Sequence, residues 1–453
     1  MDDKGAEDEY NMEYQSRVLM LPTHGKIIKR KKVEDCSNVK HPTTYLETLM
    51  HFFKGNIGSG VFAMGNAFKN SGILLGPLLL PVLGVINVYC QHLLIDAAKC
   101  VQHNFDPRKK PDFATTAEMC FADGPTKIQF LGPYVRKTIN VFLCLTQLGF
   151  CCVYFVFIST NVKQILDYYG FEYSVHTLMA FSLVPILLSC LVRTLKYLAP
   201  LSSLANVLML VGMAITLYYC CQKPYADVEN VAEIEKLPLF FGTVLYSFEG
   251  IGLVLPLQGE MKKPKYFGHK VGVLNVGMIL VGVLFSLMGI FGYLKYGSDV
   301  KGSLTLNLPE DEKLAQSVKI IITIGVMLTF ALQFFIAIEI MFPVVEKSLG
   351  PFSRPVLVEL IFRVIFVLIT FGLAEVIPFL DLFISLVGAF CSTSIALIFP
   401  PILEFVTKYS SSEITLWVVV KNLVIISIGV LGCVTGSYES IRLIVKAFKE
   451  GQS

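Results

Sequence analysis

Long apolar runs alternate with short polar segments along almost the whole chain. About eleven of these runs approach the ~20 residues that a helix needs to cross the hydrocarbon core of a bilayer. Glycines and ionisable residues interrupt two of them, whereas the others are nearly continuous. The pattern predicts an all-α integral membrane protein with about eleven transmembrane helices, over residues 43–68, 72–101, 134–161, 175–191, 198–221, 239–257, 271–295, 316–345, 355–374, 380–403 and 415–434.

Composition supports this class. Hydrophobic residues make up 54% of the 453 residues and charged residues 16%, with a mean hydropathy of +0.62. The net charge of +3 is small and most basic residues lie in loops, so membrane lipid is an expected partner and nucleic acid is not. The twelve cysteines show no metal or redox spacing. We therefore expect no cofactor, and the pattern does not specify an oligomeric state.

Charge in the segments outside the helices predicts the orientation. Residues 1–41 are expected to form a disordered tail that ends in a basic cluster at 26–32, next to the first helix. Basic segments near a span favour the cytoplasmic side, which places the amino terminus in the cytoplasm. The later loops agree, since basic and acidic loops alternate along the transporter region predicted for residues 42–436.

The carboxyl-terminal segment disagrees with this orientation. With eleven spans, the tail predicted for residues 437–453 lies outside, yet it carries Arg442, Lys446 and Lys449. A twelfth, re-entrant or interfacial segment over 438–448 would remove the conflict, although the pattern favours eleven spans.

The first and sixth apolar runs are the interrupted ones. The first contains HFFKGNIGSG, from His51, and the sixth contains SFEGIG, from Ser247. Broken helices are tolerated at membrane depth only where the freed backbone groups line a protein cavity. Because five spans precede the second break, the second unit is inverted relative to the first. The sequence thus predicts a five-plus-five inverted repeat with a ligand site between broken helices 1 and 6, although such glycines also serve helix packing.

The two breaks offer groups for both ends of an amino acid. Backbone N–H groups after the first break carry the positive end of a helix dipole and suit a carboxylate. Carbonyl groups freed before the second break suit an ammonium group. Glycine permits close backbone approach, and an aromatic ring beside the second break is expected to close one end of the pocket. The predicted substrate-binding residues are Gly58, Ser59, Gly60, Tyr246, Phe248 and Gly250.

Two ionisable residues beside the breaks are candidates for proton coupling. Polar residues spaced by three or four form one face of the first helix, which we expect to face inward: Thr44, Glu47, His51, Lys54 and Gly58. An imidazole titrates in the range of a physiological proton gradient, which makes His51 the first candidate. An ion-pair network of Glu47 with His51 or Lys54 is the structural alternative. Glu249, the second candidate, could relay a proton or cap the next half-helix.

Five segments together resemble the proton-coupled amino acid transporter family, solute carrier family 36, in the amino acid/auxin permease group. These segments are HFFKGNIGSG, LFFGTVLYSFEGIGLVLPL from Leu239, GSLTLNLP from Gly302, ALQFF from Ala331, and LDLFISLVGAFCSTSIALIFPP from Leu380. The resemblance covers residues 42 to about 438. It implies eleven spans in the fold of bacterial sodium-coupled leucine transporters, and proton-driven symport of small neutral amino acids such as alanine, glycine and proline. It also implies that His51 is essential to proton coupling.

The resemblance further implies residence in the plasma membrane or in lysosomal or late endosomal membranes, where some members signal nutrient status. Vertebrate members carry a cysteine in each of two outer loops, forming a disulfide. The corresponding loops here, about 163–176 and 297–315, contain none, which fits an invertebrate branch. An amino-acid sensor with little flux is the alternative function. A membrane enzyme is disfavoured because no nucleophile, zinc or phosphate-binding constellation is present at a membrane face.

Overall fold

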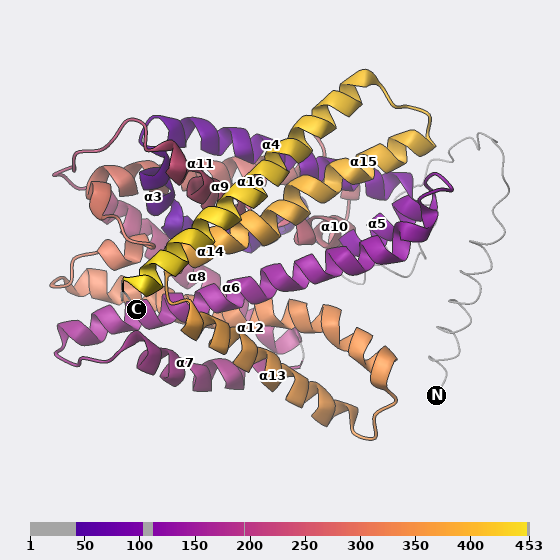
Figure 1. Ribbon diagram of the computed structural model, residues 1–453. Helices are drawn as coiled ribbons and strands as arrows, with labels where there is room; N and C mark the ends of the chain where they lie inside the picture. The colour runs from indigo at the N-terminus through magenta and orange to yellow at the C-terminus, as the bar shows by residue number, and fades with distance from the viewer. Residues whose placement is uncertain (1–41, 103–111, 194, 451–453) are drawn as a thin grey trace.

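The computed structural model describes residues 42–102, 112–193 and 195–450. Its helices run back and forth between the two ends of one bundle (Figure 1). The tail predicted over 1–41 and its basic cluster lie outside the described residues. The helices are α2 (Tyr45–Asn56), α3 (Gly60–Ser71), α4 (Leu75–Cys100), α5 (Phe113–Ala122), α6 (Gly132–Tyr168), α7 (Val175–Cys190), α8 (Leu195–Cys220), α9 (Leu237–Ser247), α10 (Ile251–Glu260), α11 (Val273–Tyr296), α12 (Lys313–Leu349), α13 (Pro355–Val376), α14 (Leu380–Val387), α15 (Phe399–Ser410) and α16 (Leu416–Lys449).

Within the described ranges, nine helical segments are long and apolar enough to cross a membrane. The predicted count of eleven differs at two places. The first span is divided into α2 and α3, of 12 residues each, and α7 has only 16 residues. None of these three helices reaches the length that crosses a bilayer alone. Eleven spans therefore stay a prediction.

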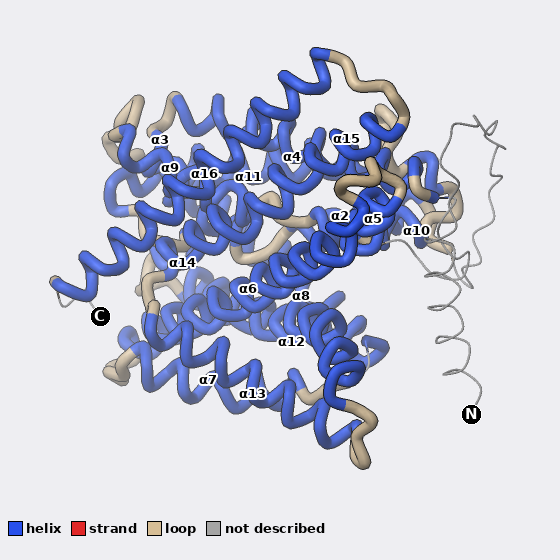
Figure 2. The backbone as a smooth tube through the Cα atoms, turned by 45° about the vertical axis from the view of Figure 1, so that its right-hand side comes forward, coloured by secondary structure: helices blue, strands red, loops and turns tan. Residues whose placement is uncertain are grey.

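Both predicted breaks are present, and they lie against each other. Residues 57–59 separate α2 from α3, and residues 248–250 separate α9 from α10. Helix α3 packs along α9, and α2 contacts α10. At the end of the bundle where α2 and α10 lie together (Figure 2), Thr43 N–H donates to Glu260 O at 2.8 Å and Lys262 N–H donates to Thr43 O at 2.9 Å. We refer to this end as the predicted inner end.

The tenth span is also irregular, which the sequence did not predict. Between α14 and α15 lie two π-helical stretches, Gly388–Ser392 and Ser394–Ile398. Their first turn touches α9 backbone to backbone, because a Cβ added at Gly388 would lie 1.8 Å from Gly242 O. Wide π turns are often found at functional sites. Here they allow the tenth span to follow the surface of the broken sixth span.

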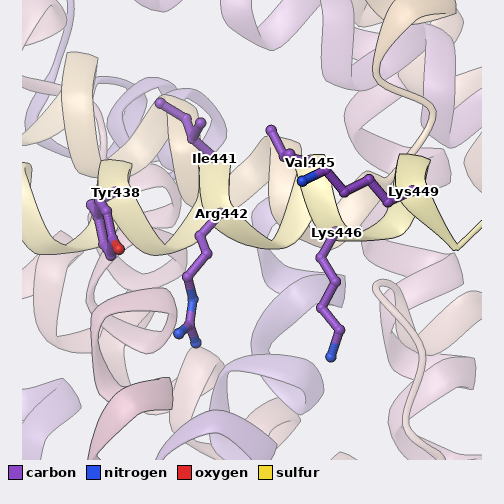
Figure 3. A pocket seen from close by; sticks show the side chains of 6 residues that line it. All are labelled: Tyr438, Ile441, Arg442, Val445, Lys446 and Lys449. Atoms are coloured by element: carbon purple, nitrogen blue, oxygen red, sulfur yellow. The ribbon is translucent and has the colours of Figure 1, made fainter.

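The last helix continues beyond residue 434, where its span was expected to end, and reaches Lys449. Its final turns line a surface groove with basic and apolar side chains, in which Arg442 and Lys446 point to the same side (Figure 3). Arg442 is paired with Glu439 at 2.8 Å and with Glu235 at 3.5 Å. Ion pairing thus offsets part of the basic charge that conflicts with the predicted orientation.

Candidate functional site between the two broken helices

The first break keeps backbone donors available. Among the described residues, no carbonyl group accepts from the N–H groups of Gly58, Ser59 or Gly60. They precede the first complete turn of α3, where helical N–H groups have no partner inside the helix. The Ser59 and Tyr246 hydroxyls are 3.0 Å apart and both residues are buried. The side chain of Ser59 thus links the first break to the last turn of α9.

Helix α6 supplies the aromatic wall of this centre. The Phe150 ring meets the Tyr246 ring edge to face, with centroids 4.7 Å apart. One turn later, the Tyr154 hydroxyl lies 3.5 Å from the Cβ position of Gly58 and near Gln333 on α12. Sequence reasoning missed Tyr154. The only signal was a hydroxyl-bearing aromatic residue in the middle of an apolar run.

An acidic residue, Glu249, lies within the second break. The carboxyl group of Glu249 lies near the backbone N–H groups of Gly250 and Ile251, at the start of α10. Its Oε2 atom is buried and has no hydrogen-bond partner in the described part of the chain. The Cys391 thiol, from the first π-helical stretch, lies near this carboxyl. Glu249 thus holds its carboxyl at the start of α10, with its Oε2 unpaired among the described residues.

Two neutral amides lie beside the second break, and the sequence did not identify them. Asn87 on α4 donates from Nδ2 to Phe248 O at 3.0 Å, while its Oδ1 has no partner among the described residues. Asn56, the last residue of α2, lies on the other side, where a Cβ at Gly250 would be 2.5 Å from its Oδ1. Amides in apolar runs carry no helical pattern that distinguishes site residues from packing residues.

The glycines of the two breaks differ in how much room they have. A Cβ at Gly60 would lie 2.5 Å from Ser247 Oγ and 2.9 Å from Ser247 Cα. Together with the Gly250–Asn56 contact, this supports the packing interpretation for Gly60 and Gly250, because real Cβ atoms do not approach so closely. Gly58 is half-buried, with Tyr154 at an ordinary distance. Gly58 is thus the glycine beside which a ligand has the most room.

Phe248 lies on the other side of the sixth span from the Ser59–Tyr246 pair. Its ring packs 5.2 Å from the ring of Phe285 on α11 and touches the Cβ position of Gly84 on α4 at 3.3 Å. The predicted role of this ring in closing the pocket stays a prediction. In this structure the ring packs between α4 and α11.

The polar face of the first helix is less buried than the sequence suggested. Glu47 and His51 are exposed, and Lys54 is half-buried. The Glu47 carboxylate accepts from the Thr44 N–H group at 2.8 Å, in a capping box that starts α2. In residues 42–102 we find no ion pair that joins Glu47 to His51 or Lys54. The face of α2 that packs in the interior is instead the one that carries Thr48, Phe52 and Asn56.

Comparison with known proteins identifies relatives of this chain. A family model described as "transmembrane amino acid transporter protein" matches residues 41–442. The "proton-coupled amino acid transporter-like protein pathetic" of Drosophila melanogaster is 36% identical, over 91% of this chain and 88% of its own length. The "probable amino acid transporter skat-1" of Caenorhabditis elegans is 28% identical, over 90% of this chain and 91% of its own length. Both relatives are invertebrate transporters and not enzymes.

Two solved structures share the architecture. Mhp1 in an inward-facing conformation superimposes with a TM-score of 0.54 at 13% identity, covering 94% of this chain and 96% of Mhp1. A manganese transporter of Eremococcus coleocola gives 0.50 at 12% identity, covering 92% of this chain and 91% of that one. At such low identity the likeness shows the fold alone. The predicted inverted-repeat fold of the leucine-transporter type is confirmed.

Proposed function

Because this chain belongs to the transmembrane amino acid transporter family, we propose that it is a symporter that carries small neutral amino acids together with protons. The observation that carries the proposal is the first break, where unpaired N–H groups lie beside the Ser59–Tyr246 hydrogen bond. The Drosophila relative is named as proton-coupled, which supports the choice of coupling ion.

The substrate carboxylate is assigned to the N–H groups of Gly58, Ser59 and Gly60. These donors sit at the amino-terminal end of α3, where the helix dipole also favours an anion. Carbonyl groups between α9 and α10, next to Tyr246, are assigned to the ammonium group. Tyr154 limits the space beside Gly58, which favours side chains of the size of alanine, glycine or proline.

Proton coupling is assigned to His51 and Glu249. The two residues occupy different environments: His51 is exposed on α2, while Glu249 is buried with one unpaired oxygen. A carboxyl without a cationic partner is costly to bury in its charged form. A proton that reaches Glu249 from the predicted inner or outer end would remove this cost. The plasma membrane and the lysosomal or late endosomal membrane are the proposed locations.

A reconstitution experiment tests the proposal. Uptake of labelled alanine into proteoliposomes should rise when the bath is more acidic than the lumen, and should change little when choline replaces sodium at fixed pH. Loss of uptake in choline would contradict proton coupling. Saturable binding of alanine without uptake would instead favour the alternative function, an amino-acid sensor.

A further inference from the structure

A lysine is buried in α12 without a partner. Lys319 is 0% exposed, and its Nζ has no hydrogen-bond partner among the residues that the structure describes. An ammonium group buried in this way is costly unless an anion or a set of oxygen atoms meets it. Glu310 and Lys301 act on it electrostatically from the adjoining loop, but with opposite signs. The protein thus provides no dedicated counter-ion in the described part of the chain.

Other unpaired polar atoms lie on the same face of α12. Gln316 precedes Lys319 by three residues and Thr323 follows it by four, so the three side chains share one side of the helix. Gln316 Oε1 and Thr323 Oγ1 are also buried, and neither atom has a hydrogen-bond partner in the described part of the chain. Gln316 Nε2 donates to Glu310 O at 2.7 Å.

Helix α6 presents matching oxygen atoms. α6 and α12 pack along each other (Figure 1), in opposite directions, with the rings of Tyr154 and Phe330 6.4 Å apart. Asn161 and Thr323 each lie seven residues further toward the predicted outer end, so this register is expected to place them at the same level. Asn161 Oδ1 is buried with no partner among the described residues, and the same holds for Gln164 Oε1.

The segment before α12, at the predicted outer end, connects the unpaired groups of α6 with those of α12. Gln164 Nε2 donates to Leu306 O at 2.8 Å. Leu306 lies between Lys301 and Glu310, the two charged residues that act on Lys319. The unpaired groups of Lys319, Gln164, Asn161 and Thr323 are therefore expected to lie between the predicted outer end and Tyr154. Tyr154 in turn lies beside Gly58 of the first break.

We propose that Lys319 is the anion-binding group of a second amino-acid site, located between α6 and α12 on the outer side of the first break. Lys319 and Thr323 donate to the carboxylate of an incoming amino acid, and the amide oxygens of Asn161 and Gln164 accept from its ammonium group. The choice of a substrate carboxylate rests on the proposed function; the chemistry of an anion site at Lys319 does not.

The test compares Lys319→Met with Lys319→Arg in the full-length protein in proteoliposomes. Lys313→Met, at an exposed position of the same helix, is the matched control. We expect the KM for alanine to rise about tenfold or more in Lys319→Met, as for loss of a charged hydrogen bond, with a smaller change in maximal rate. Lys319→Arg and Lys313→Met should stay within about threefold of the parent protein. An unchanged KM in Lys319→Met would overturn the proposal.

Two further measurements distinguish an amino-acid site at Lys319 from a purely structural lysine and from a chloride site. A lysine that serves only the fold would lower the thermal midpoint when replaced by Met, whereas removal of an unpaired buried charge should leave it equal or raise it. Replacement of chloride by gluconate should leave alanine uptake unchanged; a chloride requirement that Lys319→Met abolishes would assign the site to chloride instead.

If the parent protein shows no uptake, the proposed function fails, but the anion site can still be tested. Equilibrium binding of labelled alanine to Lys319→Met and to the parent protein in detergent then decides it: weaker binding in the variant supports the site, and equal binding excludes it.

Discussion

The two breaks occupy equivalent positions in the two repeats, yet the backbone N–H groups at the start of the following half-helix have different surroundings. At the first break, the N–H groups of Gly58, Ser59 and Gly60 have no partner in the described residues. At the second, Glu249 places its own carboxylate against the N–H groups that begin α10. Helix amino termini attract anions in both cases. The protein places its own carboxyl at the second break and none at the first, and our proposed site for a substrate carboxylate rests on this asymmetry.

The sharpest test of the second break is Gly250→Leu, from which we expect complete loss of alanine uptake. Its Cβ would lie 2.5 Å from Asn56 Oδ1, so the added side chain has to displace the Asn56 side chain at the end of α2. Gly259→Leu is the matched control, because a Cβ at this other glycine of α10 meets nothing within 4 Å. Purified protein that is folded but inactive separates a blocked site from a failed fold. Alanine uptake that survives Gly250→Leu would show that the two half-helices need no close contact.

His51→Ala addresses the half-helix before the first break. We expect most of the flux to disappear, together with its dependence on external pH, because a methyl group cannot load and release a proton. Expression and thermal stability should change little, by less than about 0.5 kcal/mol, since the side chain is exposed. Proton-dependent currents in a folded His51→Ala protein would move the coupling site to Glu249.

Glu249→Gln tests whether the carboxylate of the second break does more than cap a helix. The amide keeps the size of the side chain and can still accept from the N–H groups of α10. We expect net acid-driven uptake to fall about tenfold or more, with exchange of internal for external alanine largely retained, because exchange needs no net proton movement. An unchanged pH profile with a lower thermal midpoint would assign Glu249 to capping alone.

The sequence predicted the breaks but not their surroundings. Apolar runs interrupted by glycine locate both breaks, since broken helices need a protein cavity at membrane depth. Tyr154, Asn56 and Asn87 were missed because a single neutral polar residue in an apolar run looks the same whether it packs or binds. The contact of Ser59 with Tyr246 joins residues 187 positions apart, and no local pattern encodes it.

The inward orientation predicted for the first helix holds only in part, for a physical reason. Helical spacing shows which residues share a face, but not which face the neighbouring helices cover. The packed face of α2 carries Thr48, Phe52 and Asn56, and His51 lies outside this face. The first π-helical stretch of the tenth span lies where Gly388 meets Gly242, a contact between two spans far apart in sequence that no local pattern encodes.

Ser59→Ala is the mildest change, and it measures what the first break contributes besides backbone donors. We expect alanine affinity to fall by about 1 kcal/mol, roughly fivefold, with the pH response intact. Because the Ser59 hydroxyl also pairs with the Tyr246 hydroxyl, Tyr246→Phe and the double variant complete a mutant cycle. If the hydroxyls bind only each other, the double variant should be no weaker than either single one. A loss that persists in Ser59→Ala when Tyr246 is already Phe would show that Ser59 contacts the ligand itself.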